Sequence, residues 1–140
     1  MTPTLMGRWQ TRSAMLATIG VIVTLLFAVS YKPFNETFFY VLGWVAVFGL
    51  AWDILFILIQ RFRWDRDWPP AFQWVAGGLE ALLLYLLIDN TGLWMIDEGT
   101  VPAGIFTAHY TAVFVLTWAW TQGPMRAVLP RWRFSGGQIL

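Results

Sequence analysis

We expect an all-α membrane protein, in which four transmembrane helices form one compact antiparallel bundle over residues 1–140. The chain is 58% hydrophobic and only 12% charged, which is about half the charge of a typical soluble domain. Each of its four long apolar runs is close to the ~20 residues that a helix needs to cross a bilayer core. The runs are Ser13–Tyr31, Thr37–Gln60, Ala71–Asp89 and Gly104–Gln122.

The basic residues indicate how these helices are oriented. Eight of the nine precede the first run, separate the second from the third, or follow the fourth, and only Lys32 lies on the opposite side. Because cytoplasmic loops of membrane proteins are enriched in Lys and Arg, this asymmetry predicts cytoplasmic N- and C-termini. Residues 90–103 would then lie outside, and tryptophans near the ends of the runs would form an interfacial belt.

The first run has two features of a signal peptide, because Arg8 and Arg12 precede it and Ala28-Val29-Ser30 is a passable cleavage site. Its apolar region is longer than the usual ~7–15 residues, so we expect a retained helix. Small residues recur at every fourth position in the first and fourth runs, a spacing that lets helices approach closely in lipid. They are Gly20, Thr24 and Ala28, and Gly104, Ala108 and Ala112.

The connections suggest turns and a docking surface. Residues 32–36 are few enough to join the first two runs as a hairpin, Pro69 and Pro70 restart the chain before the third run, and Leu93–Ile96 suggests a short interfacial helix. Arginine and tryptophan side chains cluster in the second connection and the tail, where they would meet a partner subunit or anionic lipid rather than nucleic acid. They are Arg61, Arg63, Trp64, Arg66, Trp68, Arg131, Trp132 and Arg133. For the second connection, the alternative is a self-paired loop at the headgroups.

Three ionisable residues within the runs are the candidate functional groups: Asp53, Glu80 and His109. An acid at this depth costs about 2.5–3.5 kcal/mol on insertion scales, so such residues are functional candidates by default. Asp53 and Glu80 have similar depths on consecutive helices and would approach each other if their faces meet. They could pair structurally, handle protons or cations, or bind a ligand.

His109 has its own three alternatives. It could be a satisfied interfacial side chain, a proton relay or an axial ligand to chlorophyll or haem. The chain has one His and no Cys, which excludes disulfides, thiol catalysis, Cys-ligated metals and bis-His haem. We expect no catalytic residue, no metal site and no cofactor, with chlorophyll or carotenoid as the alternative.

The two ends of the chain carry a resemblance. Gly7-Arg8-Trp9-Gln10-Thr11-Arg12 at the start, and Pro130-Arg131-Trp132-Arg133-Phe134 with Gly136-Gly137-Gln138 at the end, resemble small four-span membrane proteins of cyanobacteria. The resemblance covers essentially the full chain through short terminal motifs. It implies a cyanobacterial plasma or thylakoid membrane, and it implies no catalytic residue.

These features predict a non-enzymatic accessory, scaffold or assembly subunit of a larger membrane complex, with a photosynthetic complex among the candidates. Its partners would be membrane lipids and other membrane subunits or a second copy of the chain. One alternative is a small oligomeric transporter or channel for protons or cations that uses Asp53 and Glu80. The other is a pigment-binding subunit with His109 as the axial ligand.

Overall fold

The structure, a computed structural model, describes residues 4–63 and 69–140, and the described residues form helices and no strands. Three of the residues expected at the docking surface, Trp64, Arg66 and Trp68, lie outside the described residues. One continuous helix comprises α1 (Leu5–Met15), the π-helical turn η1 (Leu16–Gly20) and α2 (Val21–Ser30). The other helices are α3 (Thr37–Arg61), α4 (Pro70–Thr91), α5 (Ala103–Gln122), α6 (Pro124–Val128) and α7 (Pro130–Phe134).

The first helix begins earlier than the apolar run that predicted it. It starts at Leu5 rather than Ser13, and the side chain of Thr4 caps it by accepting the Gly7 N–H at 3.1 Å. Hydropathy places the boundary too late because Arg8 and Arg12 interrupt the apolar run although they continue the helix. Both arginines therefore lie within the helix and not ahead of it, where they can contact groups inside the molecule.

Three helices among the described residues are long and apolar enough to cross a membrane: Leu5–Ser30, Thr37–Arg61 and Ala71–Thr91. The fourth expected span, α5, is a helix of 20 residues but is not among them. Its hydropathy is lowered by polar side chains, chiefly Thr107, His109, Thr111, Thr117 and Thr121.

The distribution of side chains differs from that of a soluble protein, because several polar residues are buried among the apolar ones and large aliphatic residues cover the surface. Polar residues lie inside, where the exposed fraction is 0% for Thr24, 2% for Asp53 and 1% for His109. Large aliphatic residues lie outside, where it is 64% for Leu26 and 61% for Val75. Large exposed apolar surfaces mark contact with lipid or with other proteins. This distribution is consistent with a membrane protein.

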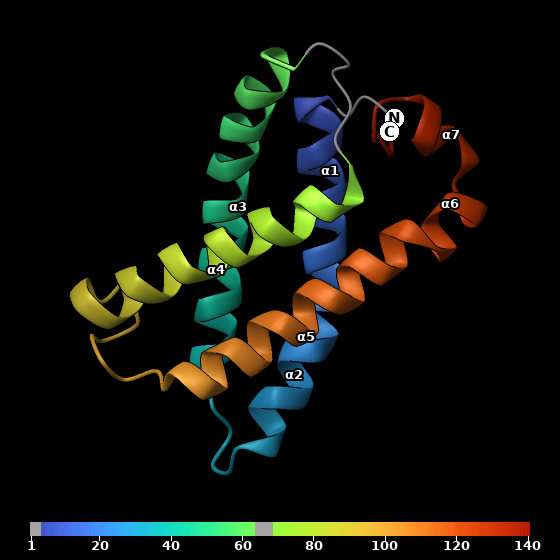
Figure 1. Cartoon of the computed structure of the whole chain (residues 1–140). Helices are drawn as coiled ribbons and strands as arrows, with labels where there is room; N and C mark the ends of the chain where they lie inside the picture. The colour runs from blue at the N-terminus through green and yellow to red at the C-terminus, as the bar shows by residue number, and fades with distance from the viewer. Residues whose placement is uncertain (1–3, 64–68) are drawn as a thin grey trace.

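Figure 1 shows the helices as two pairs that cross. The long first helix and α3 lie side by side and run in opposite directions, whereas α4 and α5 form a second pair that runs obliquely across them. α5 packs against η1 and α2, and α4 packs against α3 and α5. The molecule thus differs from a set of four aligned helices, and the crossing brings α1, α3, α4 and α5 together around one centre.

The two rows of small residues have different environments. In the first helix, Thr24 and Ala28 are fully buried at 0% exposure, so this row lies at a packed face. In α5, Gly104 and Ala108 are exposed and line a shallow groove on the outer face of the helix. The segment Leu93–Ile96 is not the expected interfacial helix, because its two end residues exchange backbone hydrogen bonds of 2.9 and 2.7 Å in a tight turn.

The two ends of the described chain are joined (Figure 1). The N–H of Thr4 donates to the carbonyl oxygen of Gly136 at 2.9 Å. Thr11 donates its hydroxyl to the carbonyl of Gly137 at 2.8 Å and accepts the indole N–H of Trp132 at 2.7 Å. We call this contact between residues 4–11 and 132–140 the terminal clasp.

Two further residues complete the terminal clasp. The side-chain oxygen of Gln10 accepts the backbone N–H of Ile139 at 2.8 Å. Gly7 permits the close approach, because a Cβ at this position would lie 2.7 Å from the carbonyl carbon of Gly137. The two terminal motifs that carry the resemblance are therefore in direct contact.

Candidate functional site

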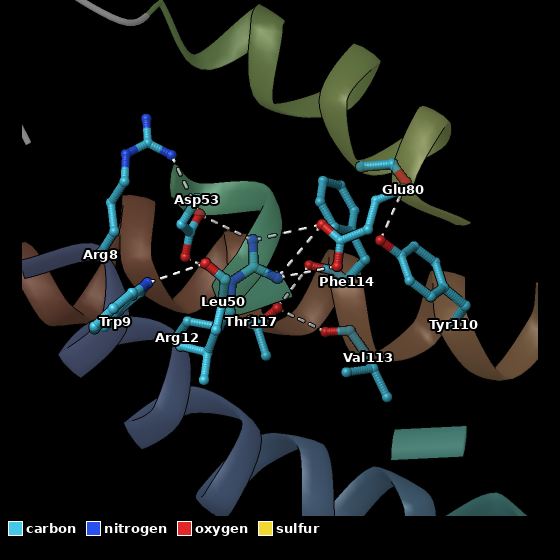
Figure 2. Close-up of polar contacts among 11 residues, drawn as sticks. Arg8, Trp9, Arg12, Leu50, Asp53, Glu80, Tyr110, Val113, Phe114 and Thr117 are labelled. Atoms are coloured by element: carbon cyan, nitrogen blue, oxygen red, sulfur yellow. Dashed lines mark hydrogen bonds and ion pairs between the residues drawn. The ribbon is translucent and has the colours of Figure 1, made fainter. Parts of the chain in front are cut away.

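The centre of the molecule holds an ion-pair cluster in which one arginine bridges two acids. The Nε of Arg12 lies 3.0 Å from Oδ2 of Asp53 and its Nη2 lies 3.2 Å from Oδ1, so this pair is bidentate. The Nη1 of the same guanidinium lies 3.1 Å from Oε1 of Glu80. Figure 2 shows the guanidinium between the two carboxylates. The structure thus brings together Asp53 and Glu80, the two acids singled out from the sequence, through a residue expected outside the membrane.

A second arginine and a glycine complete the cluster. Arg8, one turn before Arg12, places its Nη1 3.5 Å from Oδ1 of Asp53, while its guanidinium lies 5.8 Å from the ring centroid of Phe56. Gly49, one turn before Asp53 on α3, leaves room for the bridge, because a Cβ there would lie 2.6 Å from Cζ of Arg12. With two arginines and two carboxylates, the four-residue cluster has no net charge.

Hydrogen bonds and ring packing hold the helices around this cluster. The indole N–H of Trp9 donates to the carbonyl of Leu50 at 3.1 Å, which ties α1 to α3. The hydroxyl of Tyr110 donates to the carbonyl of Gly77 at 3.1 Å, which ties α5 to α4. The Phe114 ring packs so closely on Gly77 that an added Cβ would lie 2.8 Å from its Cζ.

The cluster forms part of the wall of a cavity of about 420 Å³. A volume of this size is within the range of small-molecule sites, which is about 300–1,000 Å³. The cavity runs beside α5 from His109 to Gln122 and reaches Arg126 on α6 and Gly137 of the terminal clasp. Charged, polar and apolar groups all line it. The apolar lining residues include Met15, Leu16, Leu42, Val45 and Val113.

His109, the third candidate from the sequence, is held in a separate polar contact. Its Nε2 lies 2.8 Å from the hydroxyl oxygen of Thr24 on α2, and its side chain is 1% exposed. The rings of Phe27 and Phe38 meet it edge to face, with centroid distances of 5.3 and 5.2 Å. No partner for Nδ1 is present among the described residues. The imidazole therefore fills a tight aromatic space, and His109 does not join the ion-pair cluster.

The described docking residues are placed in different ways. Arg61 and Arg131 are exposed, and the guanidinium of Arg63 lies 5.3 Å from the ring centroid of Phe72. Trp132 is only 6% exposed because its ring is part of the terminal clasp. It therefore has an internal role and not the surface role expected for it. Arg133 lies in the short helix α7.

Sequence reasoning missed Arg8 and Arg12 as members of the site. Both were assigned to the interface because they precede an apolar run. A usable signal was present, since residues four apart lie on the same face of a helix. Extending the first helix by two turns would have placed Arg12 ~10 Å from its start at 1.5 Å per residue, close to the depth of Asp53, with Arg8 one turn nearer the end. Among the described residues, no group of three His, Cys, Asp or Glu side chains is placed to hold a metal ion.

No family model, no curated protein and no solved structure matched this chain.

Proposed function

We propose that this chain is a non-enzymatic accessory or assembly subunit of a larger membrane complex. The main observation in its support is the Arg12 bridge, in which the guanidinium pairs with Asp53 at 3.0 Å and with Glu80 at 3.1 Å. Carboxylates that are paired within the chain fix the packing of α1, α3 and α4. They are poor ligands for a transported cation, since each would first have to leave the guanidinium.

The proposal includes a membrane arrangement. Four helices cross the bilayer, α5 among them, as two crossed antiparallel pairs with both termini cytoplasmic. The polar groups of α5 that line the cavity support its place as a span, because polar residues in a bilayer face the bundle interior or a water-filled space. The joined ends of the chain support termini on one side. The plasma or thylakoid membrane of a cyanobacterium is the location that the terminal motifs suggest.

The outer surface is where partners would bind. It is covered by aliphatic side chains from α2, α3 and α4, such as Ile22, Val47 and Leu82 at 61%, 57% and 56% exposure. Lipid tails cover such a surface, and so would the helices of another subunit or a second copy of the chain. Arg61 and Arg131 add exposed positive charge for lipid headgroups.

Purification from native membranes after mild cross-linking tests this proposal. We expect a defined complex that contains other membrane subunits. The matched variants are Asp53→Asn and Glu80→Gln, which retain hydrogen-bonding groups but cannot ionise. Both should weaken folding or retention of the complex while liposomes containing wild type show no proton or cation leak. A leak in wild-type liposomes that either substitution abolishes would contradict the proposal.

A transporter is the second candidate, because the cavity lies directly beside the charged cluster. It would have to oligomerise, since four helices are few for a pore. The pigment alternative has less support from the geometry. Nε2 of His109 already faces Thr24, and two phenylalanine rings occupy the adjacent space. A macrocycle at this position would have to displace them.

A further inference from the structure

The wall of the cavity exposes arginine and hides carboxylate. The side chains of Asp53 and Glu80 are 3% and 4% exposed, whereas those of Arg8 and Arg12 are 15% and 23% exposed. All four residues line the cavity. A larger fraction of each arginine side chain than of either carboxylate side chain is therefore accessible at the cluster.

A third arginine gives the wall a positive charge. Arg126 lines the cavity from α6, is exposed, and donates to the side-chain oxygen of Gln122. Its charge is added to a cluster in which two arginines balance two acids. The described lining residues therefore carry one excess positive charge, and clefts with low-dielectric walls focus such a field on an entering ion.

The shape and the neutral groups limit what fits. From His109 to Gln122 the cavity follows α5 for ~20 Å at 1.5 Å per residue. A cavity of about 420 Å³ that extends over this length is narrow. Hydroxyl and amide groups line the end near Arg126, including Thr117, Thr121 and Gln73. Such a space suits a small polar group or a single chain more than a fused ring system.

We propose that this cavity binds a carboxylate or phosphate group, which a free anion or the headgroup of an anionic lipid supplies. Arginine is the residue best suited to both groups, because its planar donors match their oxygens. Arg126 would meet the anion at the end of the cavity near the terminal clasp. Arg8 and Arg12 would line the cavity farther in, where Asp53 and Glu80 balance their charge. This ligand site goes beyond the proposed accessory function and does not depend on it.

The absence of cysteine in the sequence allows a direct test. A single cysteine replaces Thr117, which lines the cavity, or Thr111, which is exposed on the outer face of the same helix. Purified protein in a neutral detergent is treated with a negatively charged sulfonate methanethiosulfonate and with its positively charged trimethylammonium analogue. Only a hydrated thiol ionises and reacts at a measurable rate. Thr111→Cys is the matched control for contact with lipid or detergent.

We expect the anionic reagent to label Thr117→Cys about fivefold faster than the cationic one, after correction for their rates with a free thiol, as one nearby charge would produce. Arg126→Gln should reduce this preference to below about twofold. Arg131→Gln, an exposed arginine outside the cavity lining, should leave it unchanged. Gln73→Cys serves as a second cavity position should Thr117→Cys fail to fold.

Protection experiments distinguish the two sources of the anion. Slower labelling in inorganic phosphate at constant ionic strength supports a free anion. Slower labelling with phosphatidylglycerol, but not with phosphate or phosphatidylcholine, supports a lipid headgroup. Equal rates with the two reagents, or no protection by either anion, would overturn the proposal. Labelling of Thr111→Cys at the rate of Thr117→Cys would also overturn it, because the cavity position would then be no more accessible to a hydrated anion than the outer face of the helix.

Discussion

Replacing Gly49 by alanine should separate the Arg12 bridge from ordinary helix packing. Alanine favours a helix interior over glycine by about 1 kcal/mol. At position 49, however, the added Cβ would lie 2.6 Å from Cζ and 2.8 Å from Cδ of Arg12. The guanidinium would have to shift away from Asp53 and Glu80. The control is Gly43→Ala on the same helix, where a Cβ meets nothing within 4 Å.

The expected cost of Gly49→Ala has two parts. Inserting a methyl group into packed surroundings costs about 1–3 kcal/mol. Breaking a buried ion pair costs up to about 3–5 kcal/mol, of which a partial shift of the guanidinium would lose only a fraction. After the helix gain is subtracted, we expect a loss of about 1–4 kcal/mol in the free energy of unfolding. Gly43→Ala should be neutral or more stable by up to about 1 kcal/mol.

Unfolding of the purified proteins in mixed micelles, titrated with SDS and followed by near-UV circular dichroism, measures this difference. The ten tryptophans provide a strong signal. The reasoning about the bridge would be refuted if Gly49→Ala proved as stable as Gly43→Ala. The guanidinium would then not occupy the space beside Gly49.

Three further outcomes are expected. Thr11→Val should lower stability by about 1–3 kcal/mol and speed proteolysis of the C-terminal segment, because Trp132 Nε1 loses its acceptor; unchanged proteolysis would contradict the terminal clasp. A reporter fused after Leu140 should be active only when it is a cytoplasmic type, and activity of a periplasmic or lumenal type would reverse the orientation. His109→Ala should lower the free energy of unfolding by about 3 kcal/mol through the space left in the core. The wild-type protein should be colourless in an absorption spectrum. Stoichiometric pigment bands that are lost in His109→Ala would contradict the structural role of His109.

The sequence predicted the helices better than their arrangement. Runs of ~20 apolar residues fix where helices lie, because a bilayer core sets that length. The crossing of α4 and α5 over the first pair depends on local contacts such as Phe114 on Gly77, which a hydropathy pattern does not contain. The first helix began too late in the prediction because a charged side chain lowers hydropathy without ending a helix.

The candidate site was predicted in part. Asp53 and Glu80 were singled out because a buried acid is costly, and the structure places them on one guanidinium. Arg12 was not singled out, because the positive-inside rule counts every arginine near an apolar run as interfacial. The cavity could not be anticipated from the sequence, since its wall combines residues from six helices, namely the first helix, α3, α4, α5, α6 and α7, with Gly137.

The central claim is that Arg12 bridges Asp53 and Glu80 inside the molecule. A double-mutant cycle on Arg12→Gln and Glu80→Gln, with free energies of unfolding measured in mixed micelles, tests it most directly. Residues in one ion-pair network show interaction energies of about 0.5–3 kcal/mol. For contacts of 3.1 and 3.4 Å between buried charged groups, we predict a coupling of about 1.5–3 kcal/mol. A coupling below about 0.5 kcal/mol, the additivity seen for independent sites, would contradict the bridge.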